Sequence, residues 1–150
     1  MTVQQIIERK EEKPITVGPE TSLYLATQLM KQSRIGALLV LDDDDGHLVG
    51  IFTERDVVYA VGGKENEAMG QLCLKDPVKN YMVRDVRTCS VDTSIDVIMQ
   101  MMTDGRFRHV PVTDEDGGIL GMVSIGDVVK DRMEKLEKES RAMRDYIMHS

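Results

Sequence analysis

The sequence predicts an α/β fold in which two copies of one βαββα unit pack together and a long helix ends the chain. An internal repeat is the main observation: positions within 16–42 recur 72 residues later, and positions within 46–58 recur 71 residues later. The change of the offset from 72 to 71 means that the second copy is one residue shorter in an acidic turn, and turns tolerate such a deletion. Each copy holds about 45 residues, too few to bury a stable core alone, so we expect the copies to pack on each other. The repeated residues are Thr16, Thr21, Ser22, Met30, Arg34, Val40, Asp42, Gly46, Gly50, Asp56, Val57 and Val58, which return as Thr88, Thr93, Ser94, Met102, Arg106, Val112, Asp114, Gly117, Gly121, Asp127, Val128 and Val129.

Each copy begins with a short strand, at Thr16 or Thr88, and continues into a helix. The pairs Thr21–Ser22 and Thr93–Ser94 are N-cap candidates, because a hydroxyl accepts a hydrogen bond from a free N–H group of the first turn. Apolar residues at helical spacing follow both pairs. They are Leu23, Ala26, Leu29 and Met30 in the first copy and Ile95, Ile98, Met101 and Met102 in the second.

A hairpin and a second helix complete each copy. Two apolar runs flank an acidic, glycine-containing turn, which is the pattern of two antiparallel strands. The second helix begins after Thr53 in the first copy and after Ser124 in the second. The apolar runs are residues 37–41 and 48–52 in the first copy and residues 109–112 and 119–123 in the second.

We divide the chain into three parts. Residues 1–62 hold an N-terminal helix and the first copy, residues 63–85 form a connector, and residues 86–150 hold the second copy with its long helix. The connector is expected to contain short helices on either side of Asp76–Pro77, because this dipeptide interrupts a helix.

The last helix is expected to run from Asp127 to the C-terminus, since this segment contains neither proline nor glycine. Its apolar stripe alternates between four- and three-residue spacing and is interrupted by Ser140. About three heptads are present, which is marginal for an autonomous coiled coil. The stripe either packs on its own domain or pairs with a second copy of the protein. We favour pairing because the helix extends beyond the repeat to which it belongs. The stripe consists of Val129, Met133, Leu136, Met143 and Ile147.

A hydroxyl followed three residues later by an aspartate occurs where each second helix begins. The pairs are Thr53 with Asp56 and Ser124 with Asp127. Such a pair can be a capping box, in which both side chains satisfy backbone N–H groups. It can also clamp a ribonucleotide, with the carboxylate accepting the ribose hydroxyls while the hydroxyl and helix N-terminus face phosphate. Because the pair occurs twice at the same place, we favour the clamp.

Basic residues lie near both pairs. Guanidinium groups bind phosphate well because two N–H groups can donate together, although each arginine could equally be a solvated surface residue. Pro111 removes a strand N–H and so leaves a neighbouring carbonyl for a base amino group, although an edge strand explains the proline equally well. The basic candidates are Arg34, Arg55, Arg106, Arg108 and His109.

These segments resemble a tandem pair of cystathionine-β-synthase (CBS) domains. The resemblance is carried by residues 34–40, 49–56, 106–112 and 121–129 and covers about residues 13–149. It implies two βαββα units related by a pseudo-twofold axis and packed sheet to sheet. It also implies ligand clefts between the sheets, which in this family commonly hold AMP, ADP or ATP and in some small members NAD.

The resemblance also implies roles for single residues. In the first copy Ala37 and Leu39 stand where the second has His109 and Pro111, so we expect the second site to be the better one for a mononucleotide. The implied ribose ligands are Asp56 and Asp127, the phosphate contacts are Thr53 and Ser124, and the phosphate-neutralising groups are Arg55, Arg106, Arg108 and His109. The implied walls of the adenine site are Gly36, Ala37, Leu38, His109, Val110 and Pro111, with Thr16 and Thr88 at the base end.

We therefore expect a regulatory module without catalytic activity that senses energy or redox state, with AMP as the preferred ligand and ADP, ATP or NAD as alternatives. No motif of an independent hydrolase, kinase or dehydrogenase occurs. A net charge of −7 argues against nucleic-acid binding, and no apolar run is long enough to span a membrane. Two cysteines and three scattered histidines predict reduced thiols and no metal site. We expect a cytoplasmic homodimer acting on a separate protein, and the alternative is a homodimeric scaffold with vestigial clefts.

Overall fold

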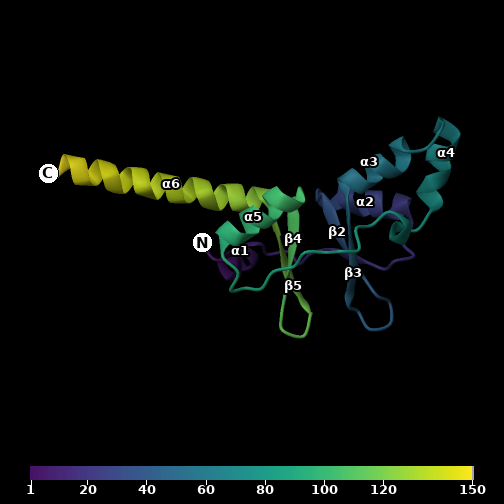
Figure 1. Cartoon of the computed structure of the whole chain (residues 1–150), viewed down its shortest axis with the longest axis horizontal. Helices are drawn as coiled ribbons and strands as arrows, with labels where there is room; N and C mark the ends of the chain where they lie inside the picture. Colours follow the sequence, from purple (N-terminus) through teal and green to yellow (C-terminus); the bar gives the residue numbers. More distant parts are fainter. Residues whose placement is uncertain (150) are drawn as a thin grey trace. The chain divides into compact units, whose positions relative to one another are not determined.

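The structure is a computed structural model that describes residues 1–149 and separates into two compact units (Figure 1). We call residues 12–87 and 115–119 the first-repeat unit, because they hold most of the first copy. We call residues 1–11, 88–114 and 120–149 the second-repeat unit. Both units have the mixed α/β composition that the sequence predicts.

The first-repeat unit follows the predicted order of elements. Its sheet has the order β1-β2-β3, with β1 parallel and β3 antiparallel to β2. Helix α2 packs its Leu23, Ala26 and Met30 into the core beside Leu38 of the sheet and Phe52 of the hairpin. The elements are β1 (Thr16–Val17), α2 (Leu23–Ser33), β2 (Ala37–Leu41), β3 (Leu48–Thr53), α3 (Glu54–Gly62), α4 (Glu67–Leu72) and two 3₁₀ turns, Cys73–Lys75 and Val78–Asn80.

The second-repeat unit repeats this order with a shorter first strand. Only an isolated parallel bridge between Cys89 and Val112 stands where β1 lies in the first repeat. In the first repeat, Leu39 N–H donates to Ile15 O at 3.1 Å. Pro111 occupies the position equivalent to Leu39 and has no N–H, so the matching ladder bond cannot form. The elements are α1 (Val3–Arg9), α5 (Ile95–Gly105), β4 (His109–Thr113), β5 (Ile119–Ser124) and α6 (Ile125–Met148).

Each repeat is completed by the segment that precedes the other repeat. Helix α1 buries Val3 and Ile6 in the core of the second repeat, and Figure 1 shows it beside β5. Val78 of the connector, 72 residues after Ile6, is buried in the core of the first repeat. The predicted boundaries place residues 1–11 with the first copy, whereas in the structure these residues pack with the second. An amphipathic helix must bury its apolar face, but its own pattern does not say against which core.

Two equivalent glycines allow these segments to approach the hairpins closely. A Cβ atom on Gly121 would lie 2.7 Å from Ile7 Cγ2, and a Cβ atom on Gly50 would lie 2.5 Å from Met82 Sδ. Carbon and sulfur atoms do not come this close without displacement. The repeated glycine therefore marks the place on each hairpin where the exchanged segment packs.

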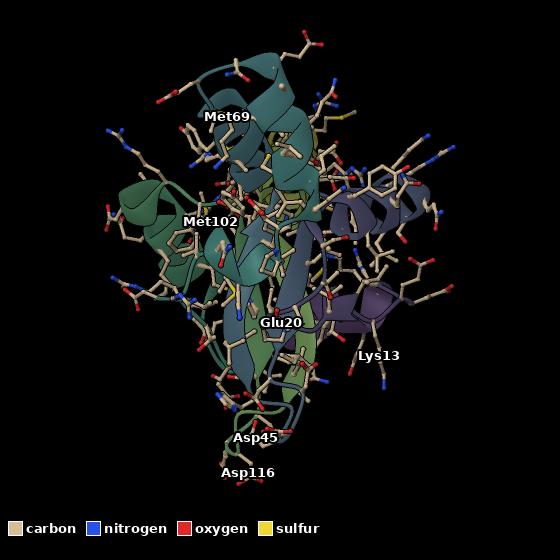
Figure 2. The ribbon with its side chains drawn as sticks, turned by 90° about the vertical axis from the view of Figure 1, so that its right-hand side faces the viewer. Lys13, Glu20, Asp45, Met69, Met102 and Asp116 are labelled. Atoms are coloured by element: carbon tan, nitrogen blue, oxygen red, sulfur yellow. The ribbon has the colours of Figure 1, made fainter. Side chains whose placement is uncertain are left out.

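The helix starts confirm the capping predictions. Ser22 Oγ accepts Leu25 N–H at 3.1 Å, and Ser94 Oγ accepts Val97 N–H at 3.2 Å. Helices α2 and α5 both end at an arginine in the left-handed region, Arg34 at φ 54° and Arg106 at φ 56°. The hairpin turns carry Asp45 and Asp116 at their tips (Figure 2).

Candidate functional site

Backbone pairing brings the predicted site segments together at one end of each hairpin. In the first repeat, Ala37 lies opposite Thr53, and Glu54 N–H donates to Gly36 O at 3.1 Å. In the second repeat, Ile125 N–H donates to Arg108 O at 2.8 Å, the equivalent position. The start of the central strand and the start of the second helix are therefore neighbours in both repeats, as the duplicated motif predicts.

Both hydroxyl–aspartate pairs form capping boxes. Asp56 Oδ2 accepts Thr53 N–H at 2.9 Å and lies 3.3 Å from Thr53 Oγ1. Asp127 Oδ2 accepts Ser124 N–H at 2.8 Å, and Ser124 Oγ accepts Asp127 N–H at 3.3 Å. The capping interpretation is therefore confirmed, and it determines how each carboxylate is oriented.

The capping boxes use only one oxygen of each carboxylate. Within residues 1–149, the hydrogen bonds of Asp56 and Asp127 all go to Oδ2. Both side chains are half-buried. Burial raises the pKa of Asp56, although the bonds from Thr53 and the nearby charge of Arg55 act in the opposite direction. Each repeat thus holds a half-buried carboxylate whose hydrogen bonds within the described residues are all made by Oδ2.

Lys10, which no sequence pattern indicates as a site residue, contacts the carboxylate of the second repeat. Lys10 Nζ lies 2.8 Å from Asp127 Oδ2 and donates to Met122 O at 2.9 Å. Lys10 sits just after α1, in a strongly charged stretch that gives no hint of a specific partner. At the 72-residue offset, Met82 is the residue equivalent to Lys10. This replacement of an apolar residue by a charged one between the two repeats is the sequence feature that could have indicated Lys10.

Four of the six residues implied to form the adenine walls are buried. Leu38 and Val110 are fully buried in the cores of their own repeats, and Ala37 and Pro111 are also buried. Thr16 and Thr88, by contrast, are exposed. The side chains of Leu38 and Val110 therefore serve packing, and only main-chain atoms of these two residues remain for ligand contacts.

The basic candidates lie at or next to the ends of helices and strands. Arg55 lies in the first turn of α3, Arg106 caps α5, and Arg108 immediately precedes β4. All three arginines are exposed, whereas His109, the first residue of β4, is half-buried. Exposure is compatible with phosphate binding but does not by itself indicate it.

Comparison with known proteins identifies the family. Residues 3–63 and 78–134 match the CBS domain. The chain belongs to the CBS-domain family. The two repeats are thus two CBS repeats, which confirms the resemblance read from their motifs.

Several solved and curated CBS proteins are similar to this chain. The crystal structure of a CBS-domain containing protein from Agrobacterium tumefaciens has 43% sequence identity and a TM-score of 0.79, covering 87% of this chain and 92% of that one. A CBS domain pair solved in complex with 5′-methylthioadenosine and S-adenosyl-L-methionine has 25% identity and a TM-score of 0.72, covering 90% and 98%. A mitochondrial CBS domain-containing protein of Arabidopsis thaliana is 34% identical over 85% of this chain and 61% of its own length. The chain spans less than two thirds of the length of the curated relatives it matches.

The acidic turn of the first CBS repeat satisfies its own polar groups. Asp42 Oδ1 accepts the N–H groups of Asp44 and Asp45 at 2.8 and 3.2 Å. The imidazole of His47 bonds to Asp45, and this bond raises the pKa of His47. Ligand atoms of Asp42, Asp45 and His47 lie within 4.8 Å of one another, the one such group among the described residues. Their mutual bonds account for this spacing.

The apolar stripe of α6 is largely exposed. Its exposed fractions run from 49% at Val129 to 67% at Met143 and Ile147, with Met133 and Leu136 between them. Within residues 1–149 the stripe is thus only partly covered, and its pairing with a second copy stays a prediction. Among residues 1–149, no helix has both the length and the hydropathy needed to cross a bilayer.

Proposed function

We propose that this chain is a regulatory module that binds an adenosine-containing ligand and carries out no chemistry on it. The observation that supports this most directly is the duplicated aspartate, which uses only Oδ2 for its hydrogen bonds within residues 1–149 and so leaves Oδ1 at the same place in both CBS repeats. A carboxylate of this kind suits the two vicinal hydroxyls of a ribose, because both hydroxyls donate.

The capping and ribose-binding interpretations are compatible. A capping box holds the carboxylate by Oδ2, so its other oxygen is already oriented before a ligand arrives. When a binding group is already fixed before the ligand arrives, less conformational entropy is lost on binding. The start of the helix also offers N–H groups and a positive dipole end to a phosphate.

AMP is the ligand that we expect to bind best, with ADP, ATP and NAD as alternatives. The arginines at positions 55, 106 and 108 favour a phosphate-bearing ligand. The related pair crystallised with 5′-methylthioadenosine and S-adenosyl-L-methionine supports the adenosine part of the proposal. It also makes sulfur-containing adenosyl compounds necessary competitors in any binding test.

We expect the second CBS repeat to hold the stronger site. Pro111 removes one donor from the strand ladder, which leaves the carbonyl before Thr88 without the partner that Ile15 O has in the first repeat. That carbonyl is suited to accept the amino group of adenine. The second repeat also carries Arg108 and His109 in place of Gly36 and Ala37, and so offers more positive charge.

We further propose that the protein acts as a homodimer on a separate protein. A ligand that binds one arrangement of the module better than another shifts the population toward it, by no more than its difference in affinity. The alternative function, a homodimeric scaffold with vestigial sites, shares the exposed α6 stripe but predicts no ligand affinity.

Calorimetric titration separates these two functions. The ligands are AMP, ATP, NAD, 5′-methylthioadenosine and S-adenosyl-L-methionine, and mass spectrometry of co-purifying small molecules identifies a ligand already bound. Asp56→Asn and Asp127→Asn keep a capping oxygen but remove the charge, and each should weaken its site by about 10- to 100-fold. Asp44→Asn, in the exposed turn, is the matched control. Affinities weaker than millimolar for all five ligands with an intact dimer would leave the scaffold as the function.

A further inference from the structure

The exposed stripe of α6 has the heptad spacing of a coiled coil. One assignment places every stripe residue in the seam, with the interrupting serine at its middle. The a positions are Met133, Ser140 and Ile147, and the d positions are Val129, Leu136 and Met143.

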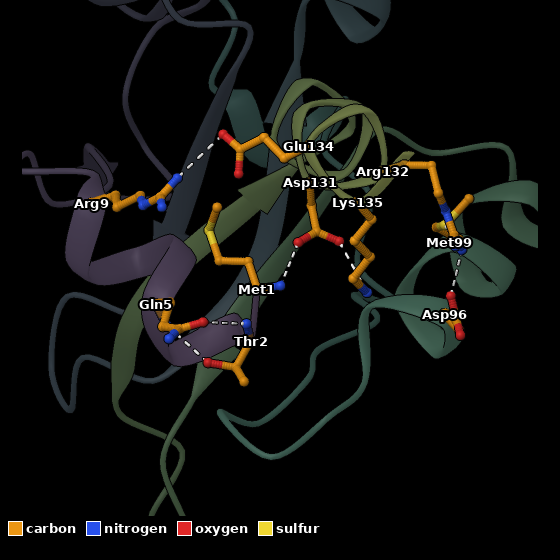
Figure 3. A network of polar contacts seen from close by, with 10 residues as sticks. All are labelled: Met1, Thr2, Gln5, Arg9, Asp96, Met99, Asp131, Arg132, Glu134 and Lys135. Carbon is orange, nitrogen blue, oxygen red and sulfur yellow. Dashed lines mark hydrogen bonds and ion pairs between the residues drawn. The ribbon is translucent and has the colours of Figure 1, made fainter. Parts of the chain in front are cut away.

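The opposite face of α6 is already occupied by α1. The side chain of Asp131, at an f position, is 2% exposed and lies 2.7 Å from the terminal ammonium group of Met1. Arg9 Nη1 of α1 lies 3.5 Å from Glu134 Oε1, one turn further along α6 (Figure 3). Because α1 fixes this face, a second chain has to approach α6 from the side of the largely exposed stripe.

The stripe continues into an apolar hollow where α6 leaves the second CBS repeat. This hollow of about 200 Å³ lies between α5 and α6 and is lined by Met99, Ile125, Val128, Val129 and Met133. An apolar seam that extends into a hollow gives a partner helix more surface to bury than the helix ridge alone.

The charges beside the seam complement each other in a parallel homodimer. In that arrangement each g residue lies near the e residue five positions further along the other helix. Arg132 then faces Glu137 of the second copy, and Glu139 faces Arg144. By symmetry the dimer has four such pairs, all of opposite charge. Arg132 also donates to Asp96 Oδ1 at 2.6 Å, but both side chains are exposed and the guanidinium group has further donors.

An antiparallel homodimer with the same seam brings like charges together. In that arrangement e residues face e residues and g residues face g residues. Glu137 would then lie near Glu137 of the second copy, Glu139 near Glu139, and Lys130 near Arg144. Like charges at close range disfavour this pairing, so the charge pattern discriminates between the two orientations.

We infer that α6 pairs with the α6 of a second copy in a parallel, in-register coiled coil. This inference rests on the homodimer of the proposed function and adds its orientation, the helix that forms it and the residues that select it. Ser140, the polar a residue, faces its own counterpart at the middle of the seam. A polar pair at one a position favours a single register.

Cysteine cross-linking of the full chain tests the orientation. Met133→Cys and Ser140→Cys each place a thiol at an a position, and Lys138→Cys places one at an f position as the control. Both native cysteines are buried, which limits background linkage. In a parallel dimer each a position lies beside itself, within reach of a disulfide. We expect linked dimers from both a variants and none from the f variant under mild oxidation. In an antiparallel dimer at most one a position can lie beside itself.

Charge reversal provides a second test with a different readout. Glu139→Arg alone and Arg144→Glu alone put like charges opposite each other, so each homodimer should dissociate at an at least three-fold higher concentration. A mixture of the two variants restores both pairs, so we expect mainly heterodimers, measured by mass spectrometry. Light scattering that shows a dimer without either a-position link overturns the orientation alone. A monomer overturns the homodimer as well, whereas nucleotide affinity is measured separately by calorimetry.

Discussion

Lys10 and Asp127 form an ion pair with 2.8 Å between Nζ and Oδ2, and this pair makes the two CBS repeats chemically different. At the equivalent position of the first repeat, Met82 is buried against Gly50. The two aspartates therefore share a capping geometry but differ in what lies beside their carboxylates. The lysine adds a positive charge to the site that we propose to be the stronger one.

Lys10→Met gives the second repeat the residue of the first and should weaken its binding of AMP about three- to ten-fold. The lysine contributes charge to the site and holds the Asp127 carboxylate, whereas the exposed ion pair itself adds less than about 1 kcal/mol to stability. The measurement is calorimetry with AMP in an Asp56→Asn background, where the second site dominates. Lys13→Met is the matched control. Unchanged affinity together with a large loss of stability would make Lys10 a purely structural residue.

The pH dependence of the first site should follow Asp56. Burial raises the pKa of this carboxyl, and only its ionised form accepts both ribose hydroxyls. Affinity for 5′-methylthioadenosine, which has no phosphate to titrate, should therefore fall as the pH is lowered from 7 toward 4. An Asp127→Asn background isolates the first site for this calorimetric measurement.

The contribution of Asp56 to stability should change with pH in the opposite direction to the ligand affinity. A folded pKa above the unfolded value means that folding takes up a proton between these two pKa values. This carboxyl therefore contributes less stability as the pH rises from the unfolded pKa through the folded pKa. The free energy of unfolding of the wild type, relative to Asp56→Asn, should thus increase as the pH falls from 7 toward 4. Urea denaturation at both pH values measures it. A difference independent of pH would mean that Asp56 titrates as it does in the unfolded chain.

Local patterns in the sequence predicted most of the fold and which segments lie together at the candidate site. The 72-residue offset located equivalent helices and hairpins, and the hydroxyl-aspartate pairs located both helix starts. The contacts of Lys10 and Asp131 could not be predicted, because each residue meets its partner through packing between segments more than 100 residues apart in the sequence. A charged residue in a charged stretch looks solvated until the tertiary contacts are known. The packing of the segment before each repeat against the other repeat could not be predicted for the same reason.

The exchanged packing of α1 can be tested at Gly121. Gly121→Ala would place a methyl group 2.7 Å from Ile7 Cγ2, so α1 must shift and stability should fall by about 1–3 kcal/mol. Adding Ile7→Ala removes the clashing side chain, and the double variant should lose less than the two single losses added together. Gly62→Ala, where no atom lies within 4 Å, is the control and should not destabilise the protein. Additive losses in denaturant titrations would argue against the contact.

Asp131 should be the carboxylate on which the second-repeat unit depends most for stability. Burial alone would raise the pKa of Asp131, but the hydrogen bond and charge of the Met1 ammonium group, together with Lys135, lower it overall. Its Oδ2 atom is buried and makes no hydrogen bond within the described residues, and Lys135 Nζ lies 3.5 Å away (Figure 3). Removing the charge leaves the ammonium group buried without a counter-ion.

Asp131→Asn should therefore cost about 3 kcal/mol at pH 7, measured by urea denaturation. Because the folded pKa is lowered, the wild-type advantage is complete above the unfolded value of about 3.9 and disappears as the pH falls through the folded pKa. Glu134→Gln, on the same face of α6 but more exposed, should change stability by less than about 1 kcal/mol. Equal losses for the two variants would show that the Met1–Asp131 pair is no stronger than a surface ion pair.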